Sequence, residues 1–314
     1  MKKLAVIILF CATLVPIISC ATGKPVVDTA STRIPGDKEM MLGVKWYQKG
    51  CYRRSLEYFF KAYELYSSID ALEGVAKCLN NIGITYRAMG NYDRALLFLD
   101  EAYSQYVDIN DMKGTLMALS NKAGVLIDKG ELDSADRVLN QAMGIKSKLH
   151  ENTLYIPLLN NKGVLLTKRK EFHKAEEILR ICIREADRSD NLLMASVNFA
   201  MGNLMFESKR FNEALGFFNN ALYYDRKASF FKGIAEDLFF LGMTCVKLNN
   251  DSEAIKFWKR CIKIYALIGN PKRVYETMRL LKGLAKENKI NIEVIEIFVE
   301  RWEEGRLFEN LCGD

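Results

Sequence analysis

Small and large apolar residues recur along this chain in a fixed order, with a period near 40 residues. Each set begins with a glycine or alanine, followed after twelve residues by a small residue, after four more by a large apolar one and after three more by another small one. The six sets are Gly43/Ser55/Phe59/Ala62, Gly83/Ala95/Leu99/Ala102, Ala123/Ala135/Leu139/Ala142, Gly163/Ala175/Leu179/Cys182, Gly202/Ala214/Phe218/Ala221 and Gly242/Ala254/Trp258/Cys261. Apolar spacings of three and four indicate amphipathic helices, and repetition at this period predicts an all-α solenoid of stacked helix pairs.

Each unit is expected to consist of two antiparallel helices, A and B, joined by a short polar turn. In the second unit the pattern predicts helix A over 78–89, a break at Gly90-Asn91 and helix B from 92 to about 107. Gly83 and Ala95 carry almost no side chain, so the two backbones can approach closely there. Similar turn residues recur at Lys49-Gly50, Lys129-Gly130, Arg169-Lys170, Ser208-Lys209 and Asn249-Asn250.

The residues after the sixth unit, 271–314, are expected to form helices that cover the end of the stack. The first of these helices is predicted to begin at Asn270-Pro271, because proline is favoured at the first helical position. Its apolar stripe is Met278, Leu281, Leu284 and Ala285. The stripe predicted for the last helix is Val294, Ile297, Phe298 and Trp302.

These motifs resemble the tetratricopeptide repeat family. The family pattern of Leu-Gly-x-x-Tyr, a turn and Ala-x-x-x-Phe is matched closely by Ile82-Gly83 with Tyr86 and by Ala95 with Leu99. The resemblance covers about residues 36–270 and implies a right-handed superhelix of about six helix pairs. The chain departs from the family in its period, 40 residues rather than 34, and in lacking the proline that usually closes each unit.

In this family the A helices line a concave groove, and the residues two and three before the marker glycine lie at or near its surface. The corresponding pairs are Met40-Met41, Asn80-Asn81, Ser120-Asn121, Asn160-Asn161, Phe199-Ala200 and Phe239-Phe240. Asn81, Asn121 and Asn161 would form a ladder along the groove, and their amides both donate and accept hydrogen bonds, as an extended peptide requires. The resemblance therefore implies that a partner binds in this groove.

The other candidate binding residues are Phe199 and Phe239 as apolar anchors, and Arg87 and Lys168 as carboxylate contacts. Each candidate has a structural alternative. The asparagines, including Asn80 and Asn160, can bond to the neighbouring unit, the phenylalanines can belong to the core, and the cations can be solvated surface charges.

Composition and motifs argue against catalysis. Hydrophobic residues make up 49% and charged residues 27% of the 314 residues, as in globular proteins, and the formal net charge is +6. No lysine–arginine run indicates a nucleic-acid interface. The 2 histidines lie in no catalytic motif, and neither a CxxC pair nor a phosphate-binding glycine loop occurs. The chain is therefore expected to be no enzyme and to bind no cofactor, metal or nucleic acid.

Residues 1–19 are predicted to be a secretory signal peptide. Lys2 and Lys3 precede an apolar run that Pro16 interrupts, which is too short for a transmembrane helix. The run ends in Ile17-Ile18-Ser19-Cys20, which resembles the bacterial lipobox. This resemblance implies that Cys20 becomes a lipid-anchored N-terminus. The alternative is an ordinary signal peptide with a cysteine there by chance.

Residues 20–35 are expected to form a flexible tether, because they are rich in Thr, Ser, Gly and Pro. Ala21 and Thr22 stand where enterobacterial inner-membrane lipoproteins carry an aspartate. Resemblance to that sorting rule favours the bacterial outer membrane, with the soluble part facing the periplasm. In such a compartment Cys51 and Cys312 are the thiols expected to be most exposed, and no disulfide is assigned.

The predicted function is that of a protein-interaction scaffold or adaptor anchored at the bacterial cell envelope, which binds a partner protein or extended peptide in its groove. An alternative is a regulatory module that senses a peptide or small ligand by changing the pitch of the superhelix. A third, a degenerate repeat domain fused to catalysis, has little support in the sequence.

Overall fold

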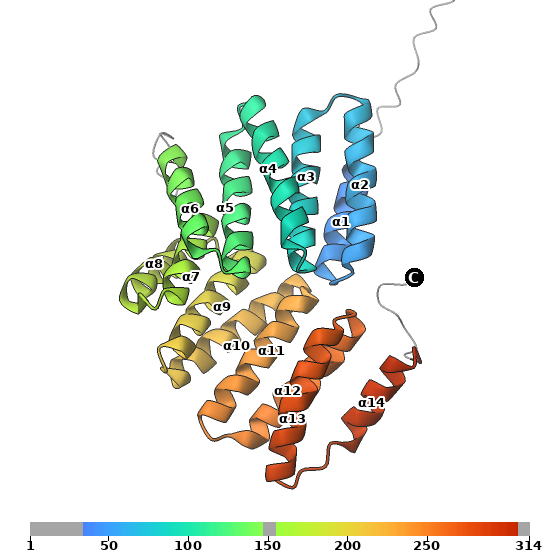
Figure 1. The fold of residues 1–314 in the computed structure, drawn as a ribbon, viewed down its shortest axis with the longest axis vertical. Helices are drawn as coiled ribbons and strands as arrows, with labels where there is room; N and C mark the ends of the chain where they lie inside the picture. Colours follow the sequence, from blue (N-terminus) through green and yellow to red (C-terminus); the bar gives the residue numbers. More distant parts are fainter. Residues whose placement is uncertain (1–33, 147–154, 307–314) are drawn as a thin grey trace, which may run out of the picture. The chain divides into compact units, whose positions relative to one another are not determined.

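The computed structural model describes residues 34–146 and 155–306, and these residues form fourteen helices and no strands (Figure 1). The predicted signal peptide, Cys20 and most of the predicted tether lie outside the described residues. So does Cys312. The predicted all-α solenoid fold is confirmed.

Twelve of the helices form six A/B pairs. They are α1 (Asp37–Gln48) with α2 (Tyr52–Ser68), α3 (Leu72–Ala88) with α4 (Tyr92–Asp108), α5 (Met112–Lys129) with α6 (Leu132–Lys146), α7 (Ile156–Lys168) with α8 (Phe172–Glu185), α9 (Asn191–Glu207) with α10 (Phe211–Ala228), and α11 (Phe231–Lys247) with α12 (Asp251–Leu267). Two further helices, α13 (Pro271–Glu287) and α14 (Glu293–Glu303), follow the sixth pair.

The turns within the units share one backbone feature. The residue seven positions after each marker glycine or alanine has a positive φ, which reverses the chain after helix A. These residues are Gly50, Gly90, Gly130, Lys170, Lys209 and Asn249, with φ between 58° and 86°. Helix α3 begins at Leu72, earlier than the predicted 78, because a left-handed residue, Asp70, already ends the preceding unit.

The marker glycines make room for the large apolar residue sixteen positions later. A Cβ on Gly83 would lie 2.6 Å from Leu99 Cγ, and one on Gly202 would lie 2.7 Å from Phe218 Cδ1. Gly43, Gly163 and Gly242 have the same relation to Phe59, Leu179 and Trp258. The third unit has Ala123 at this place, and it is buried like Ala95, Ala135, Ala175, Ala214 and Ala254 on the B helices.

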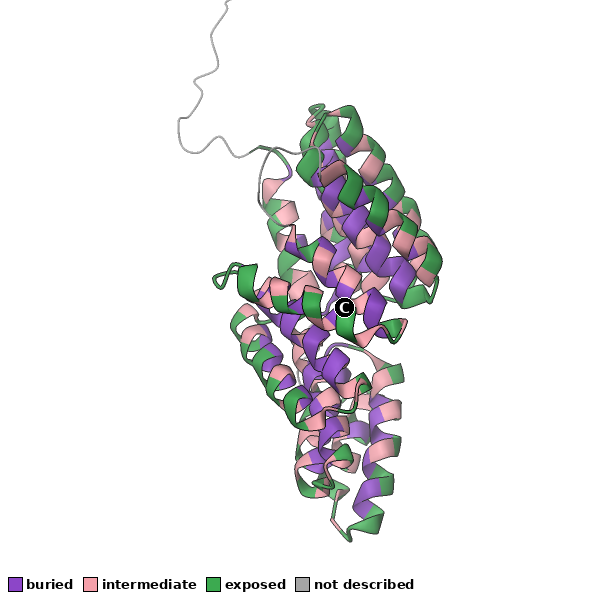
Figure 2. Cartoon of the chain, turned by 90° about the vertical axis from the view of Figure 1, so that its left-hand side faces the viewer, coloured by how far each residue is buried: buried purple, intermediate pink, exposed green. Residues whose placement is uncertain are grey.

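The buried faces lie between the A and B helices of each unit and between successive units (Figure 2). Successive A helices also pack on one another, α3 on α5, α5 on α7 and α7 on α9, whereas the B helices of neighbouring units pack less closely. Neighbours approach most closely on the inside of a curved stack. The A helices therefore form the inner layer of the solenoid.

The stripe predicted for the last helix is partly wrong. Helix α14 buries Ile295 and Val299, while Val294 is 76% exposed and Ile297 48% exposed. Phe298 and Trp302 do pack against the core. Because residues four apart share a helix face, the buried row at 295 and 299 turns Val294 and Ile297 away from α12.

Candidate functional site: the inner surface of the A helices

Direct contacts join the first two units to the sixth. Lys232 Nζ on α11 donates a hydrogen bond to the Ala88 carbonyl at the end of α3, 3.3 Å away. The rings of Tyr47 and Phe230 stack with their centroids 6.0 Å apart, and Lys232 Nζ lies 5.8 Å from the ring centroid of Tyr52. The C-terminal ends of α1 and α3 therefore face the N-terminal end of α11, and the side of the A helices turned toward these contacts is called the inner surface below.

Charged and aromatic side chains gather where these helix ends meet. We call this group the cross-turn cluster, and it consists of Tyr47, Tyr52, Arg87, Asp128, Lys232 and Glu236. Arg87 Nε donates to Asp128 Oδ2 at 2.7 Å, and these side chains are 31% and 38% exposed. Glu236 pairs with Arg273 of α13. The cluster is thus partly accessible to a ligand although several helices surround it.

The predicted asparagine ladder connects neighbouring units. Asn121 Nδ2 donates to Asn80 Oδ1 at 2.9 Å, and Asn161 Nδ2 donates to the Ser120 carbonyl at 2.7 Å. Asn81 Nδ2 contacts Met40 Sδ at 3.1 Å. Each of these bonds spans 41 residues, so the amides hold successive A helices in register. The side-chain N–H groups of Asn81, Asn121 and Asn161 thus contact the neighbouring unit, which is the structural alternative given for them above. Recognition of a peptide by these three half-buried side chains stays a prediction.

The second pair of asparagines is buried. Asn80 accepts from Asn121, and Asn160 donates to Ser196 Oγ at 3.0 Å. Buried amides that bond between helices cannot reach a partner in this conformation. The assignment of Asn80 and Asn160 to the binding surface is therefore corrected, since both hold the A-helix layer together.

Phe239, predicted as an apolar anchor, is only 6% exposed. Its ring packs under the Arg273 guanidinium, 4.4 Å from the centroid. Its proposed role as an anchor is corrected, because α13 covers it. Phe199 is half-buried and contacts the rings of Phe218 and Phe240 at 5.6 and 5.4 Å. Its role as an apolar anchor stays a prediction.

The two predicted cationic contacts differ in their surroundings. Arg87 belongs to the cross-turn cluster and already pairs with Asp128. Lys168 is exposed at the end of α7 and stands at the same repeat position as Asp128, five residues after the marker residue. The structure thus places Lys168 beside the inner surface but away from the cross-turn cluster.

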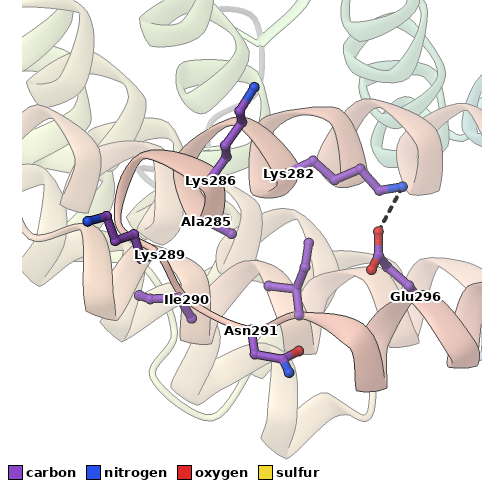
Figure 3. A pocket seen from close by; sticks show the side chains of 8 residues that line it. Lys282, Ala285, Lys286, Lys289, Ile290, Asn291 and Glu296 are labelled. Carbon is purple, nitrogen blue, oxygen red and sulfur yellow. Dashed lines mark ion pairs between the residues drawn. The ribbon is translucent and has the colours of Figure 1, made fainter.

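A basic depression of about 500 Å³ lies between α13 and α14 (Figure 3). Lys282, Lys286 and Lys289 line it over a floor that includes Ala285, and Lys282 Nζ pairs with Glu296 at 2.9 Å. Lysines at a helix C-terminus interact favourably with the helix dipole. This position explains the charge of the depression without a ligand.

Two aspartates are buried together between α10 and α11. A Cβ on Gly233 would lie 1.9 Å from Asp225 Oδ2, so the glycine makes room for this carboxyl. Neither oxygen of Asp237, which is 0% exposed, accepts a bond from any donor in the described part of the chain. Burial raises the pKa of both aspartates. Burial away from donors favours the neutral, protonated form of a carboxyl.

The prediction that the Cys51 thiol is exposed is wrong. It is buried and disulfide-bonded. The neighbouring Gly50 lies against the sixth unit, where a Cβ would be 3.0 Å from Ile268 Cβ. The contact between the first and last units therefore covers the turn that carries Cys51.

Part of the chain matches a known protein family. The tetratricopeptide repeat model matches residues 44–106, which run from α1 into α4. Over these residues the chain is similar to tetratricopeptide repeats. A search of curated protein sequences finds no match.

Solved structures share the fold of this chain. The Rap conjugation gene regulator of the plasmid pLS20, in complex with the Phr* peptide, is 15% identical, with a TM-score of 0.60 over 83% of this chain and 74% of that one. A Rap protein complexed with competence and sporulation factor is 12% identical, with a TM-score of 0.55 over 79% and 74%. A tetratricopeptide-repeat protein of Thermus thermophilus is 23% identical, with a TM-score of 0.49 over 68% and 98%.

Proposed function

We propose that this protein is a non-catalytic scaffold that binds a partner protein or an extended peptide on its inner surface. The observation that carries the proposal is the cross-turn cluster, where charged and aromatic side chains of several units converge and remain partly accessible. The two Rap structures were solved with the Phr* peptide and with competence and sporulation factor, which agrees with such a role for this fold.

The scaffold is proposed to be anchored by a lipid on Cys20 and to face the periplasm from the bacterial outer membrane. The support is the Ile17-Ile18-Ser19-Cys20 motif after an apolar run. The disulfide at Cys51 agrees with an exported protein, because disulfides persist in oxidising compartments. Among the helices of the described ranges, none is long and apolar enough to cross a membrane.

A second candidate function is a sensor that responds to a bound peptide. It is favoured by the bond from Lys232 to Ala88, which links units 144 residues apart. A ligand that entered between these helix ends would change how the first and sixth units approach. Such a ligand would alter the pitch of the whole stack.

Partner binding can be tested by a crosslinked pull-down from detergent-solubilised envelopes. Native protein is compared with Arg87→Glu in the cross-turn cluster and with Arg180→Glu on the B helix α8 as a matched control. Loss of a partner with Arg87→Glu alone supports the scaffold. Equal recovery with all three proteins would argue against binding at the cross-turn cluster.

The anchor is tested separately by Cys20→Ala. This variant is expected to leave the membrane fraction or to remain unprocessed, because the acceptor thiol is missing. Unchanged attachment and processing would refute the lipoprotein assignment.

A further inference from the structure

Cys51 takes part in a disulfide whose partner is none of the other cysteines in the described ranges. Cys51 is disulfide-bonded. The other cysteines of residues 34–146 and 155–306 are free thiols, and they are Cys78, Cys182, Cys245 and Cys261. The whole chain has 8 cysteines. The partner of Cys51 is therefore Cys11, Cys20 or Cys312.

The proposed export of the protein excludes two of these three candidates. Cys11 lies within residues 1–19, which are predicted to be removed as a signal peptide. The sulfur of Cys20 carries the lipid in the proposed anchor, so it is no longer a thiol that can form a disulfide. Cys312 remains. This exclusion rests on the proposed anchor, whereas the positions of the helix ends favour Cys312 independently of it.

The turn that carries Cys51 lies at the C-terminal end of α12. A Cβ on Gly50 in that turn would be 3.0 Å from the Cβ of Ile268, the residue that follows α12. The ring of Tyr47, just before the turn, stacks on Phe230 at the start of α11. The first unit therefore meets one end of the sixth unit, and Cys51 is next to that contact.

Helix α14 runs parallel to α12 and ends at this same end of the sixth unit (Figure 1). It starts beside the middle of α12, because Lys259 Nζ donates to the Asn291 carbonyl at 3.1 Å. It ends beside the first turns of α13, where the ring centroids of Trp302 and Tyr275 are 6.1 Å apart. Since α13 begins directly after α12 ends, the C-terminal ends of α12 and α14 lie close together.

The segment from Arg306 to Cys312 is long enough to join these ends. Gly305, with a φ of 68°, ends α14 in a left-handed turn that directs the chain away from the helix axis. Six extended residues span up to about 20 Å, and packed helices lie about 8–10 Å apart. Cys20, by contrast, precedes α1, and the Cys51 turn follows the far end of that helix.

We propose that Cys51 and Cys312 form a disulfide that ties the C-terminal segment of the chain to the first unit. Forming this bond removes two protons and two electrons from the two thiols, and an external disulfide takes them up and becomes a dithiol. The bond holds the turn between α1 and α2 near Ile268, so it limits how far the first and sixth units can separate. In an oxidising compartment the two ends of the superhelix stay in contact, and reduction releases them.

Disulfide mapping of the full-length protein tests the pairing. The protein is purified from envelopes after free thiols are blocked with N-ethylmaleimide, and trypsin then releases Cys51 in peptide 50–53 and Cys312 in peptide 307–314. The proposal predicts that these two peptides are linked in protein that runs as a monomer on a non-reducing gel, and that reduction separates them. Cys51 that is blocked, linked to Cys20 or linked between two chains would overturn the proposal. A bond to Cys20 would also refute the lipid anchor, whereas the other outcomes leave the proposed partner binding and anchor untouched.

Urea unfolding tests the effect of the bond on the whole chain. Cys312→Ser should unfold at a urea concentration about 1 M lower than native protein, because the cross-link no longer restricts the unfolded chain. Dithiothreitol should lower the native midpoint to the same value. It should leave the midpoint of Cys312→Ser unchanged, which controls for the buried free thiols. Asn310→Ser, a substitution in the same segment, should unfold like native protein.

Amide hydrogen exchange tests the contact between the first and sixth units. In Cys312→Ser, exchange of residues 47–53 should become several-fold faster, because the turn is no longer tied to the end of the solenoid. Exchange in α6 of the third unit should stay the same. Equal midpoints and equal exchange in Cys312→Ser and native protein, with and without reductant, would overturn the proposal that the bond holds these units together.

Discussion

The packing of the marker glycines is tested by one substitution made at two places in the fifth unit. Gly202 lies in α9 and Gly216 in α10, and both are replaced by alanine. A Cβ at 202 would lie 2.7 Å from both Cδ1 and Cε1 of Phe218, whereas a Cβ at 216 meets nothing within 4 Å. The two variants therefore differ in packing but not in the chemistry of the change.

The expected magnitudes follow from two effects. Replacing glycine by alanine inside a helix stabilises it by about 1 kcal/mol at either site. At Gly202 the new methyl group also overpacks the core, which costs about 1–3 kcal/mol. Phe218 cannot easily move aside, because its ring lies 5.4 Å from that of Phe240 and 5.6 Å from that of Phe199. The free energy of unfolding should therefore be about 1–3 kcal/mol lower for Gly202→Ala than for Gly216→Ala.

The assay is urea unfolding followed by circular dichroism, with the slope m compared between variants. Gly216→Ala should unfold at higher urea than native protein. Gly202→Ala should unfold at lower urea than Gly216→Ala with a similar m. Equal stabilisation by the two substitutions would refute the argument that the glycine makes room for Phe218.

Two further substitutions test buried polar groups. Asn121→Ala removes the donor to buried Asn80 and should lower the free energy of unfolding by about 1–3 kcal/mol. As a control, Asn219→Ala on the exposed side of α10 should change the free energy of unfolding by less than about 0.5 kcal/mol. Equal effects of the two substitutions in urea unfolding would count against the asparagine ladder. Burial raises the pKa of Asp225 and Asp237, so the folded chain keeps protons that the unfolded chain releases above about pH 4. The free energy of unfolding should therefore fall as the pH rises above that value. The decrease is at most about 1.4 kcal/mol per pH unit for each proton. Asp237→Asn should make the free energy of unfolding less dependent on pH, and this variant should be more stable than native protein at pH 8 but not at pH 4. The measurement is urea unfolding across this pH range. The same pH dependence in variant and native protein would show that the pair is not protonated.

The helix pairs were predictable because their determinants are local. The distance of sixteen residues from Gly83 to Leu99 is set by one turn and two helical faces, and it is visible as a spacing. The last helix was harder, because its stripe depends on which side α12 covers. Sequence spacing alone did not distinguish Ile295 and Val299 from Val294 and Ile297.

The cross-turn cluster could not be predicted in the same way. Lys232 meets Ala88 because small rotations between successive units accumulate over 144 residues, and no spacing in the sequence records that sum. The same contact covers Cys51, which a local reading placed in an exposed turn. The amide ladder was recognised as a pattern, but its direction toward the neighbouring unit depends on how closely successive A helices approach.

The most direct test of a binding inner surface is photocrosslinking in living cells. A photoreactive amino acid is placed at Lys168 on the A helix of the fourth unit, or at Glu177 on the B helix of the same unit, and adducts are resolved by mass. Because both side chains are exposed, they differ in the surface they sample rather than in access. The account predicts a discrete adduct from position 168 and none from position 177. An adduct from position 177 alone would contradict it and would place the partner on the outer side of the solenoid.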